Sequence, residues 1–214
     1  NQRFALFCPE KRPFFLEGLE KFNFGGSYHG DPLSAIVHTR TIVNPLVGFK
    51  LNGKIGDKNT LAMIYAMDEL PEIDIENQAH FGIFRYKRAL NKDSYIGGIY
   101  TTRERSTGFN RVAGTDGQLR INPSSILGYH AFMSQTKLNE TSPSDKGHAL
   151  GLDYFHQTRN WIVMLGLQDI AKDFHTETGY LTRKDITRFR SGILRMFYPD
   201  SKILKRIDPM IHST

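Results

Sequence analysis

The carboxylates Asp116 and Asp153 are the residues of this chain that most resemble a catalytic pair. Each lies where apolar and polar residues alternate, so both could face one enclosed space, as the paired carboxylates of glycosidases do. A polar lining of that space explains the two residues more simply, and it extends to Arg120 and His130. We therefore predict that these four side chains face the interior of the fold, and we assign no catalytic residue.

Other patterns that resemble reactive sites are incomplete. GFKLNGKI (48–55) nearly matches a phosphate-binding loop, but Ile55 stands where that loop needs Ser or Thr to bind magnesium. The sequence has no G-x-S-x-G motif, and its eight histidines lack the spacing of zinc ligands. Cys8 is the single cysteine, which excludes an internal disulfide. We expect neither a cofactor nor a metal ion.

The composition narrows the class of protein. The 214 residues include 28 basic and 22 acidic ones, with a net charge of +6 and no block of like charge. The cations of FRYKR (84–88) divide between the two faces of a strand, so we expect no nucleic-acid partner. No apolar run approaches the ~18 residues of a membrane-spanning helix, which leaves insertion as a β-barrel open. Because the sequence starts at Asn1, we expect a removed leader or an excerpt of a longer protein.

From about residue 47 onward, segments of about ten residues with a period of two alternate with turn-rich breaks. The pattern predicts strands near 35–42, 47–56, 60–69, 79–89, 94–105, 110–121, 125–137, 148–158, 161–170 and 186–198, and a last one from about 203.

The connections alternate between short and long. The short ones are 57–59, 90–93, 122–125, 159–160 and 200–202, and the long or intermediate ones are 70–78, 106–109, 139–147 and 171–185. In an antiparallel meander, alternate connections lie at the same end of the sheet. Tight turns at one end and long loops at the other are typical of outer-membrane β-barrels, whose short turns are periplasmic.

Each expected strand has one large apolar face and one small or polar face. The apolar face, which we expect to meet lipid, includes Leu61, Met63, Leu127, Leu152 and Leu165, and in the last strands Leu194, Met196 and Tyr198. The other face, which we expect to line the lumen, includes Gly128, Asp153 and Gly166. A soluble antiparallel sheet with one face in water shows the same alternation, so alternation alone does not separate the two folds. The length of the strands and the pattern of loop lengths favour the membrane barrel.

Residues 1–34 do not follow this rhythm. Their stretch PEKRPFFLEG (9–18), followed by FNFG (22–25), resembles the signature of a bacterial outer-membrane family, common in Bacteroidota and catalogued as carbohydrate-binding family 9 domain-containing proteins. The similarity continues in 35–42, 48–56, 110–120 and 172–190, with departures at Thr41, His175, Thr176 and Tyr180. The residues of the junction motif are Pro9, Glu10, Lys11, Arg12, Pro13, Phe14, Phe15, Glu17 and Gly18.

Rhythm and resemblance together predict an all-β fold. We expect part of an antiparallel up-and-down transmembrane β-barrel over 35–214, with an irregular N-terminal plug segment, residues 1–34, before it. The resemblance implies that the junction motif lies where a periplasmic domain hands over to the barrel. We expect an open sheet, or one completed from outside these residues, in which 35–42 and the last strand do not pair.

These expectations suggest a membrane-embedded function in the bacterial outer membrane. The protein would act as a pore, a scaffold or a component of a surface assembly. Its partners would be outer-membrane lipid, other outer-membrane or periplasmic proteins, and glycan. Two alternatives stay open: a soluble basic β-protein that binds polyanions, and an enzyme that acts on glycosides within the lumen.

Overall fold

The computed structural model describes residues 7–28, 30–69, 78–201 and 203–213. The large sheet consists of β2 (Pro45–Ile55), β3 (Asn59–Glu69), β4 (Gln78–Asn91), β5 (Ser94–Glu104), β6 (Phe109–Asn122), β7 (Ser125–Lys137), β8 (Asp145–Gln157), β9 (Trp161–Ile170), β11 (Ile186–Arg195) and β12 (Met210–Ser213). A small sheet pairs β1 (Leu33–Ala35) with β10 (Tyr180–Leu181). The helical elements are α1 (Pro13–Leu16) and the 3-10 turns η1 (Leu19–Phe22) and η2 (Thr39–Thr41). None of the helices in these residues is long and apolar enough to cross a membrane.

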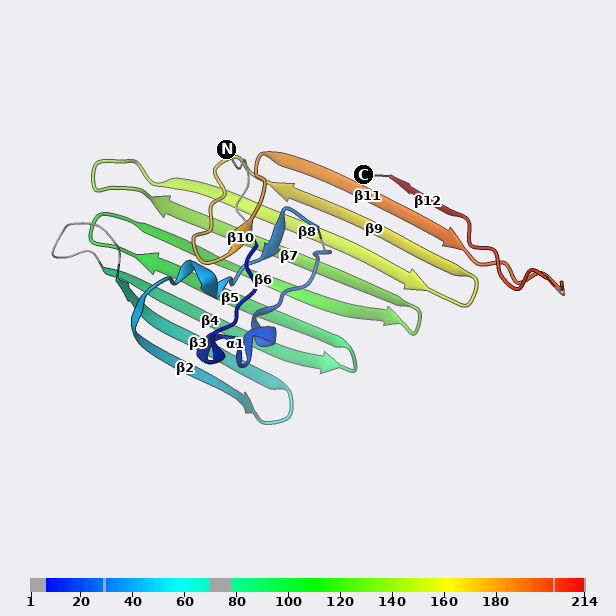
Figure 1. Ribbon diagram of the computed structural model, residues 1–214, viewed down its shortest axis with the longest axis horizontal. Coiled ribbons are helices and arrows are strands. Elements are labelled where there is room, and N and C mark those ends of the chain that lie inside the picture. The colour runs from blue at the N-terminus through cyan, green and yellow to red at the C-terminus, as the bar shows by residue number, and fades with distance from the viewer. Residues whose placement is uncertain (1–6, 29, 70–77, 202, 214) are drawn as a thin grey trace.

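The large sheet is an up-and-down antiparallel meander of ten strands (Figure 1). Each strand is hydrogen-bonded to the next one along the chain, except that β10 leaves the sheet between β9 and β11 and pairs with β1. This arrangement confirms the all-β antiparallel fold class.

The tight turns lie at one end of the meander, toward the lower right of Figure 1. They are 56–58, 92–93, 123–124 and 158–160, and the longer connections 105–108, 138–144 and 171–185 lie at the other end. The predicted alternation is therefore confirmed for these connections, while the loop expected at 70–78 falls almost entirely outside the described residues. The short connection expected at 200–202 is wrong, because β11 and β12 are joined by the long stretch 196–209.

Two predicted strands are wrong. Residues 36–44 form no strand, and their apolar residues Ile36, Val37 and Ile42 are buried in the core beneath a 3-10 turn instead. The last strand starts at Met210 and not near 203, because residues 203–209 form a protruding ribbon whose only bridge joins Ile207 to Phe197. In 36–44 tertiary packing, and not sheet pairing, produces the apolar spacing, whereas Ile203, Leu204 and Ile207 of the ribbon are exposed.

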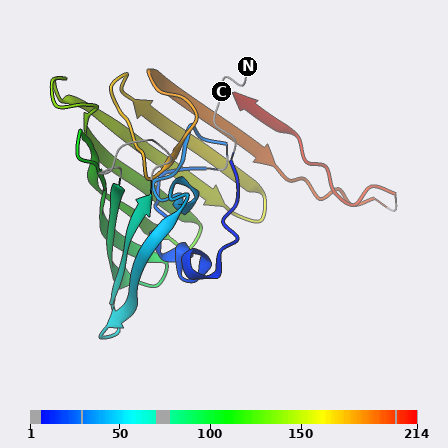
Figure 2. The same ribbon diagram turned by 60° about the vertical axis from the view of Figure 1, so that its left-hand side comes forward.

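The sheet is curved and open. Figure 2 shows it bending around the plug segment, so that one face is concave and the other convex. β2 and β12 lie at its two edges and do not pair with each other. The expectation of an open antiparallel sheet, in which 35–42 does not pair with the last strand, is confirmed.

The two faces separate as the alternation predicts over β3–β9. On β7, Gly128 and His130 are buried on the concave face, while the larger Tyr129 and Met133 point to the convex side. Leu152 and Leu165 are likewise exposed on the convex face.

The face assigned to Leu194 is wrong. Leu194 lies opposite Ile162, in the same phase as Arg190 opposite Gly166, and therefore on the concave side. Both phases of β11 carry apolar residues, so alternation does not decide its orientation. The ion pair of Arg190 with Asp31 of the plug segment favours the observed phase.

Candidate functional site

The plug segment crosses the concave face where the strands carry glycine. A β-carbon on Gly25 would lie 2.3 Å from the carbonyl oxygen of Gly117. One on Gly128 would lie 2.7 Å from the nitrogen of Gly26, and one on Gly151 would lie 2.6 Å from the oxygen of Gly26. These distances leave no room for a side chain on either partner. The plug backbone is therefore seated directly on the backbone of β6, β7 and β8.

A buried ion pair between two strands binds the plug segment to the sheet at this crossing. Arg85 of β4 and Asp116 of β6 are 1% and 0% exposed, and they form a two-fold contact through Nη1–Oδ1 and Nη2–Oδ2, the latter 2.8 Å long. Asp116 Oδ2 also accepts hydrogen bonds from the Gly25 nitrogen and the Tyr95 hydroxyl, each 3.0 Å. Arg85 Nη2 donates to the carbonyl oxygen of Asn23 at 3.1 Å. Both charges are thus shared between the strands and the plug backbone.

An aromatic cluster lies beside the ion pair. Phe24 of the plug packs edge-on against His130 and Phe132, with ring centroids 4.9 and 5.2 Å away. His130 Nδ1 lies 3.1 Å from the carbonyl oxygen of Gly25. His130 therefore contributes a hydrogen bond and an aromatic face to the seat of the plug.

The junction motif forms a clasp around the turn η2. Arg12 binds the Glu10 carboxylate with Nε at 2.9 Å and Nη2 at 2.8 Å, and it donates to the carbonyl oxygens of Thr39 and Ile42. The Thr39 hydroxyl donates to Glu10 at 2.7 Å. Hydrogen bonds from Arg12, followed by that from Thr39, lower the pKa of Glu10 to about 2. The motif thus ties the start of the plug segment to the residues just before β2.

The short helix of the motif braces the edge strand β2. Lys50 Nζ donates to the carbonyl oxygens of Phe14 and Glu17, at 2.7 and 3.0 Å, and pairs with the Glu17 carboxylate. These carbonyls end the helical turn, where a cation is favourable. Phe14 packs over Gly48, where a β-carbon would lie 3.0 Å from the ring.

The loop 171–185 folds inward and covers the other end of the concave face. Glu177 pairs with Arg103 at 3.1 Å and with Arg105, and its nitrogen donates to Asn110 Oδ1 at 2.8 Å. Burial opposes ionisation of Glu177, but the His175 ring, whose Nε2 lies 3.6 Å from Oε1, and the charges of the two arginines lower its pKa to about 2. This loop and the plug segment meet through the pairing of β1 with β10.

A second ion pair joins the plug to β11. Asp31 is buried, lies 2.8 Å from Arg190 Nη1 and accepts a hydrogen bond of 2.7 Å from the nitrogen of Tyr28. The Arg190 guanidinium lies 4.7 Å from the centre of the Tyr28 ring. The contacts of the plug segment with the large sheet therefore extend from β2 on one side to β11 on the other.

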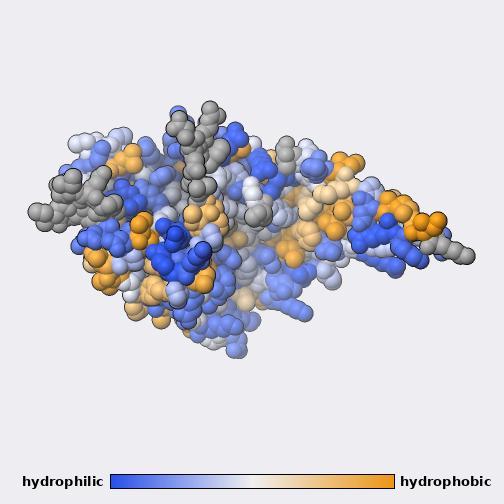
Figure 3. All heavy atoms as spheres, in the orientation of Figure 1, coloured by the Kyte–Doolittle hydropathy of each residue, from blue (hydrophilic) through white to orange (hydrophobic). Residues whose placement is uncertain are grey.

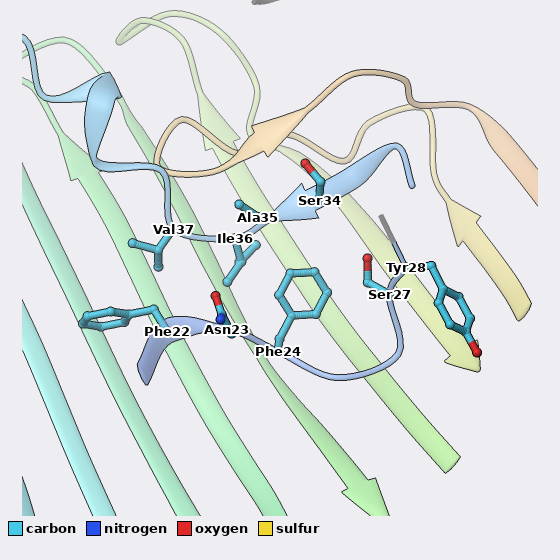
Figure 4. A pocket seen from close by; sticks show the side chains of 9 residues that line it. All are labelled: Phe22, Asn23, Phe24, Ser27, Tyr28, Ser34, Ala35, Ile36 and Val37. Atoms are coloured by element: carbon cyan, nitrogen blue, oxygen red, sulfur yellow. The ribbon is translucent and has the colours of Figure 1, made fainter. Parts of the chain in front are cut away.

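A cavity of about 350 Å³ lies between the plug segment and the residues that follow it (Figure 4). Its lining comes from two stretches, 22–28 and 34–37, and mixes aromatic rings with the hydroxyls of Ser27 and Ser34. Among the described residues that line it, the Tyr28 phenol is the only titratable group. These residues offer the cavity a few hydrogen-bonding groups and no arrangement for acid–base chemistry.

The structure places the polar residues singled out from the sequence in different settings. Asp116, His130 and Asp153 lie on the concave face, and Arg120 lies at the tight-turn end, where it pairs with Asp93 at 3.0 Å. Asp116 and Asp153 belong to the same sheet face and do not oppose each other across a space. The partners of Asp116 occupy its carboxylate, which leaves no oxygen free to act on a substrate.

Sequence reasoning missed Arg85, Asp31 and Glu177. Arg85 stands in FRYKR, which shows neighbouring cations but not which one is buried. Its partner is 31 residues away, so only the strand register identifies the pair. The turn-rich setting of Asp31 and Glu177 gave no signal of a structural role.

The convex face is apolar and exposed. Its large side chains include Phe49, Leu51, Phe84, Tyr100, Met133, Leu150, Leu152, Leu165, Leu167, Phe189 and Ile193, all at least 36% exposed. Figure 3, which views the molecule from the plug side, shows hydrophilic residues interspersed with apolar ones and an apolar patch at the right, toward β11 and β12. The exposed apolar convex face and the apolar patch near β11 and β12 both show which parts of the sheet would avoid contact with water.

Comparisons with protein-family models, with curated proteins and with solved structures find no match. Within the described residues, no group of three or more His, Cys, Asp or Glu side chains is placed to hold a metal ion.

Proposed function

We propose that this chain forms part of the lipid-facing wall of a transmembrane β-barrel in a bacterial outer membrane, with the plug segment as a fixed scaffold in the lumen. The observation that carries the proposal is the distribution of polarity between the two sheet faces. The covered face holds charged and polar residues together with apolar ones, whereas the exposed face is dominated by large apolar side chains.

Water does not favour this distribution, because it leaves an apolar sheet face exposed while charged side chains are buried. A one-sided sheet in water covers its apolar face and exposes its polar one. Here Arg85, Asp116 and Gln168 are at most 4% exposed, while Met133 is 67% and Phe189 58% exposed. An apolar patch spanning many strands is far larger than a soluble monomer normally leaves open. Lipid supplies the missing apolar partner.

The apolar residues form an oblique belt. Straight across the sheet from Phe84, the row of paired residues runs through Tyr100 and Met133 to the polar His148. On β8 the apolar residues are displaced toward the tight-turn end, at Leu150 and Leu152. In a closed barrel the strands are tilted relative to the barrel axis. An apolar belt of constant height in the membrane then crosses the rows of paired residues obliquely, as observed here.

The strands have the length that the proposal needs. The long strands β2–β9 and β11 contain 10–14 residues. A tilted strand crosses the hydrocarbon core with about 9–11 residues. Polar pairs at the strand ends would then lie at the level of the lipid headgroups.

The open edges must be paired for this proposal to hold. The free edge of β2 presents a row of backbone groups, and each such group left unsatisfied in lipid costs several kcal/mol. We infer that further strands pair with β2 and with the β12 side and close the barrel. The location and the partners follow from this proposal. The partners are outer-membrane lipid and other outer-membrane or periplasmic proteins, and the family resemblance alone adds glycan.

Substitutions on the convex face test the proposal. Leu165→Arg and Leu152→Arg each place a charge in the middle of the apolar belt. Each substitution is expected to make insertion into the bilayer less favourable by about 2–4 kcal/mol. The matched control is Ile203→Arg, because Ile203 is 94% exposed on the ribbon beyond the sheet. Insertion into lipid vesicles is measured by resistance to urea extraction and by migration of the unheated protein on gels.

The opposite result would refute the proposal. A protein that remains monomeric and dispersed without detergent is not a membrane wall. Equal insertion of Leu165→Arg and Ile203→Arg would show that the convex face does not meet lipid. The soluble β-protein would then explain the fold.

A further inference from the structure

The convex face has charged residues at both borders of its apolar belt, and the two borders differ. At the long-loop border both carboxylates have a basic partner. Glu104 accepts hydrogen bonds from Arg111 at 2.6 and 3.0 Å, and Asp169 accepts one from His148 at 2.8 Å. The arginine of this border, Arg111, is therefore already neutralised by a carboxylate.

At the tight-turn border two arginines lie on aromatic rings, as Arg111 does on Phe109 at the other border, but among the described residues they have no carboxylate partner like the Glu104 of Arg111. Arg195 lies 4.5 Å from the centre of the Trp161 ring and 4.7 Å from that of Phe197. Arg159 lies 5.4 Å from the centre of the Tyr198 ring. In the described part of the chain neither guanidinium forms an ion pair with a carboxylate.

The excess of cations extends along the tight turns. Each of the stretches 53–60, 88–95, 120–126 and 156–162 has one more Lys or Arg than Asp or Glu. Arg88 lies on the convex face of β4, three residues before the strand ends at Asn91, and likewise forms no ion pair with a carboxylate among the described residues. From β4 to β11 the border crosses seven strands of the sheet, which corresponds to about 30 Å at the usual strand spacing.

We propose that this border, which we call the arginine border (Arg88, Arg159 and Arg195 with Trp161, Phe197 and Tyr198), binds the phosphate groups of anionic phospholipids. The inference rests on the proposed function, because it requires the convex face to lie in a bilayer. A guanidinium presents planar donors that match two phosphate oxygens, and stacking on a ring fixes that plane. Tryptophan and tyrosine rings favour the same depth in the bilayer.

The geometry favours lipid over a soluble polyanion. Arg159 and Arg195 stand together beside β9 and β11, and Arg88 stands apart on β4, whereas a nucleic acid would require a continuous basic groove. Here an arginine lies on one face of each ring. Headgroups at Arg88 and at the neighbouring Arg159 and Arg195 fit this arrangement.

A lipid-selectivity measurement tests the inference. The protein, purified in detergent, is reconstituted into vesicles of phosphatidylcholine alone or mixed with phosphatidylglycerol, and the co-purifying lipids are counted by native mass spectrometry. The double variant Arg159→Gln, Arg195→Gln is compared with Arg111→Gln at the opposite border. The preference for phosphatidylglycerol is expected to fall about fivefold per guanidinium, the equivalent of ~1 kcal/mol each, and less at high salt.

Each outcome decides a different point. Loss of preference in the double variant but not in Arg111→Gln supports the arginine border. An unchanged preference in the double variant, or an equal loss in Arg111→Gln, overturns it while insertion still supports the membrane wall. Failure of the wild-type protein to insert into either vesicle overturns the proposed function and this inference together.

Discussion

The ion pair between Arg85 and Asp116 allows the docking of the plug segment to be tested in depth. Asp116→Asn keeps the size of the side chain and a hydrogen-bond acceptor but removes the charge. Arg85, which is 1% exposed, would then be a buried cation without a counter-ion. Removing one partner of a buried pair typically costs about 3–5 kcal/mol, and we expect a loss of that size in the free energy of unfolding.

Two comparisons separate charge from packing. Asp93→Asn breaks the ion pair of Asp93 with Arg120, in which the Asp93 side chain is 45% and the Arg120 side chain 30% exposed. This substitution should lower the free energy of unfolding by at most about 1 kcal/mol. Combining Asp116→Asn with Arg85→Met removes both charges, and at least half of the lost stability should return.

Urea unfolding in detergent gives the free energies, and limited proteolysis reports release of the plug segment. Asp116→Asn should release the plug at lower urea than Asp93→Asn does. If the two variants unfold within about 1 kcal/mol of each other, the buried pair does not hold the plug and the reasoning fails.

Three further predictions concern the seat of the plug and its clasps. Gly128→Ala should expose the plug to protease, because a β-carbon there would lie 2.7 Å from the plug backbone, whereas Gly53→Ala meets open space and should behave as wild type. The Glu10 clasp should be fully formed above the unfolded pKa of about 4.5 and weaken as the pH falls toward 2, and Glu10→Gln should abolish this dependence in hydrogen exchange. Glu177→Gln should increase protease cleavage within 171–185 while cleavage of the junction motif stays unchanged, and equal cleavage at both sites would contradict separate anchoring.

Local pattern predicted the sheet because a strand imposes a period of two on its own residues. Tight turns and alternating faces placed β3–β9 within a few residues. The same rule failed at 36–44, where Ile36 and Ile42 are buried by tertiary contacts without forming a strand. It also failed on β11, where both phases are partly apolar.

The site could be predicted only in part. Alternation placed Asp116, His130 and Asp153 on one face, but their partners depend on register and on the path of the plug. Arg85 pairs across β5 with Asp116 and with plug carbonyls, and no local pattern contains that information. The glycines that contact the plug segment can be recognised in the sequence as small residues. The sequence does not show why they are small, because the backbone that packs against them is more than 90 residues away.

The way the plug is held bears on the choice between a pore and a scaffold. A gate must leave its seat without a large penalty. Withdrawal of this plug would leave Arg85 and Asp116 without their backbone partners and would open a glycine-lined seat that no side chain can fill. Because backbone-to-backbone packing cannot shift by small side-chain rotations, intermediate positions are also disfavoured. The clasp at Glu10, the Arg190 pair and the inward loop would have to open in the same step. A solute path on this side of the proposed barrel is therefore disfavoured, and the fastening of the plug to β2 suggests that its role is to fix the shape of the wall.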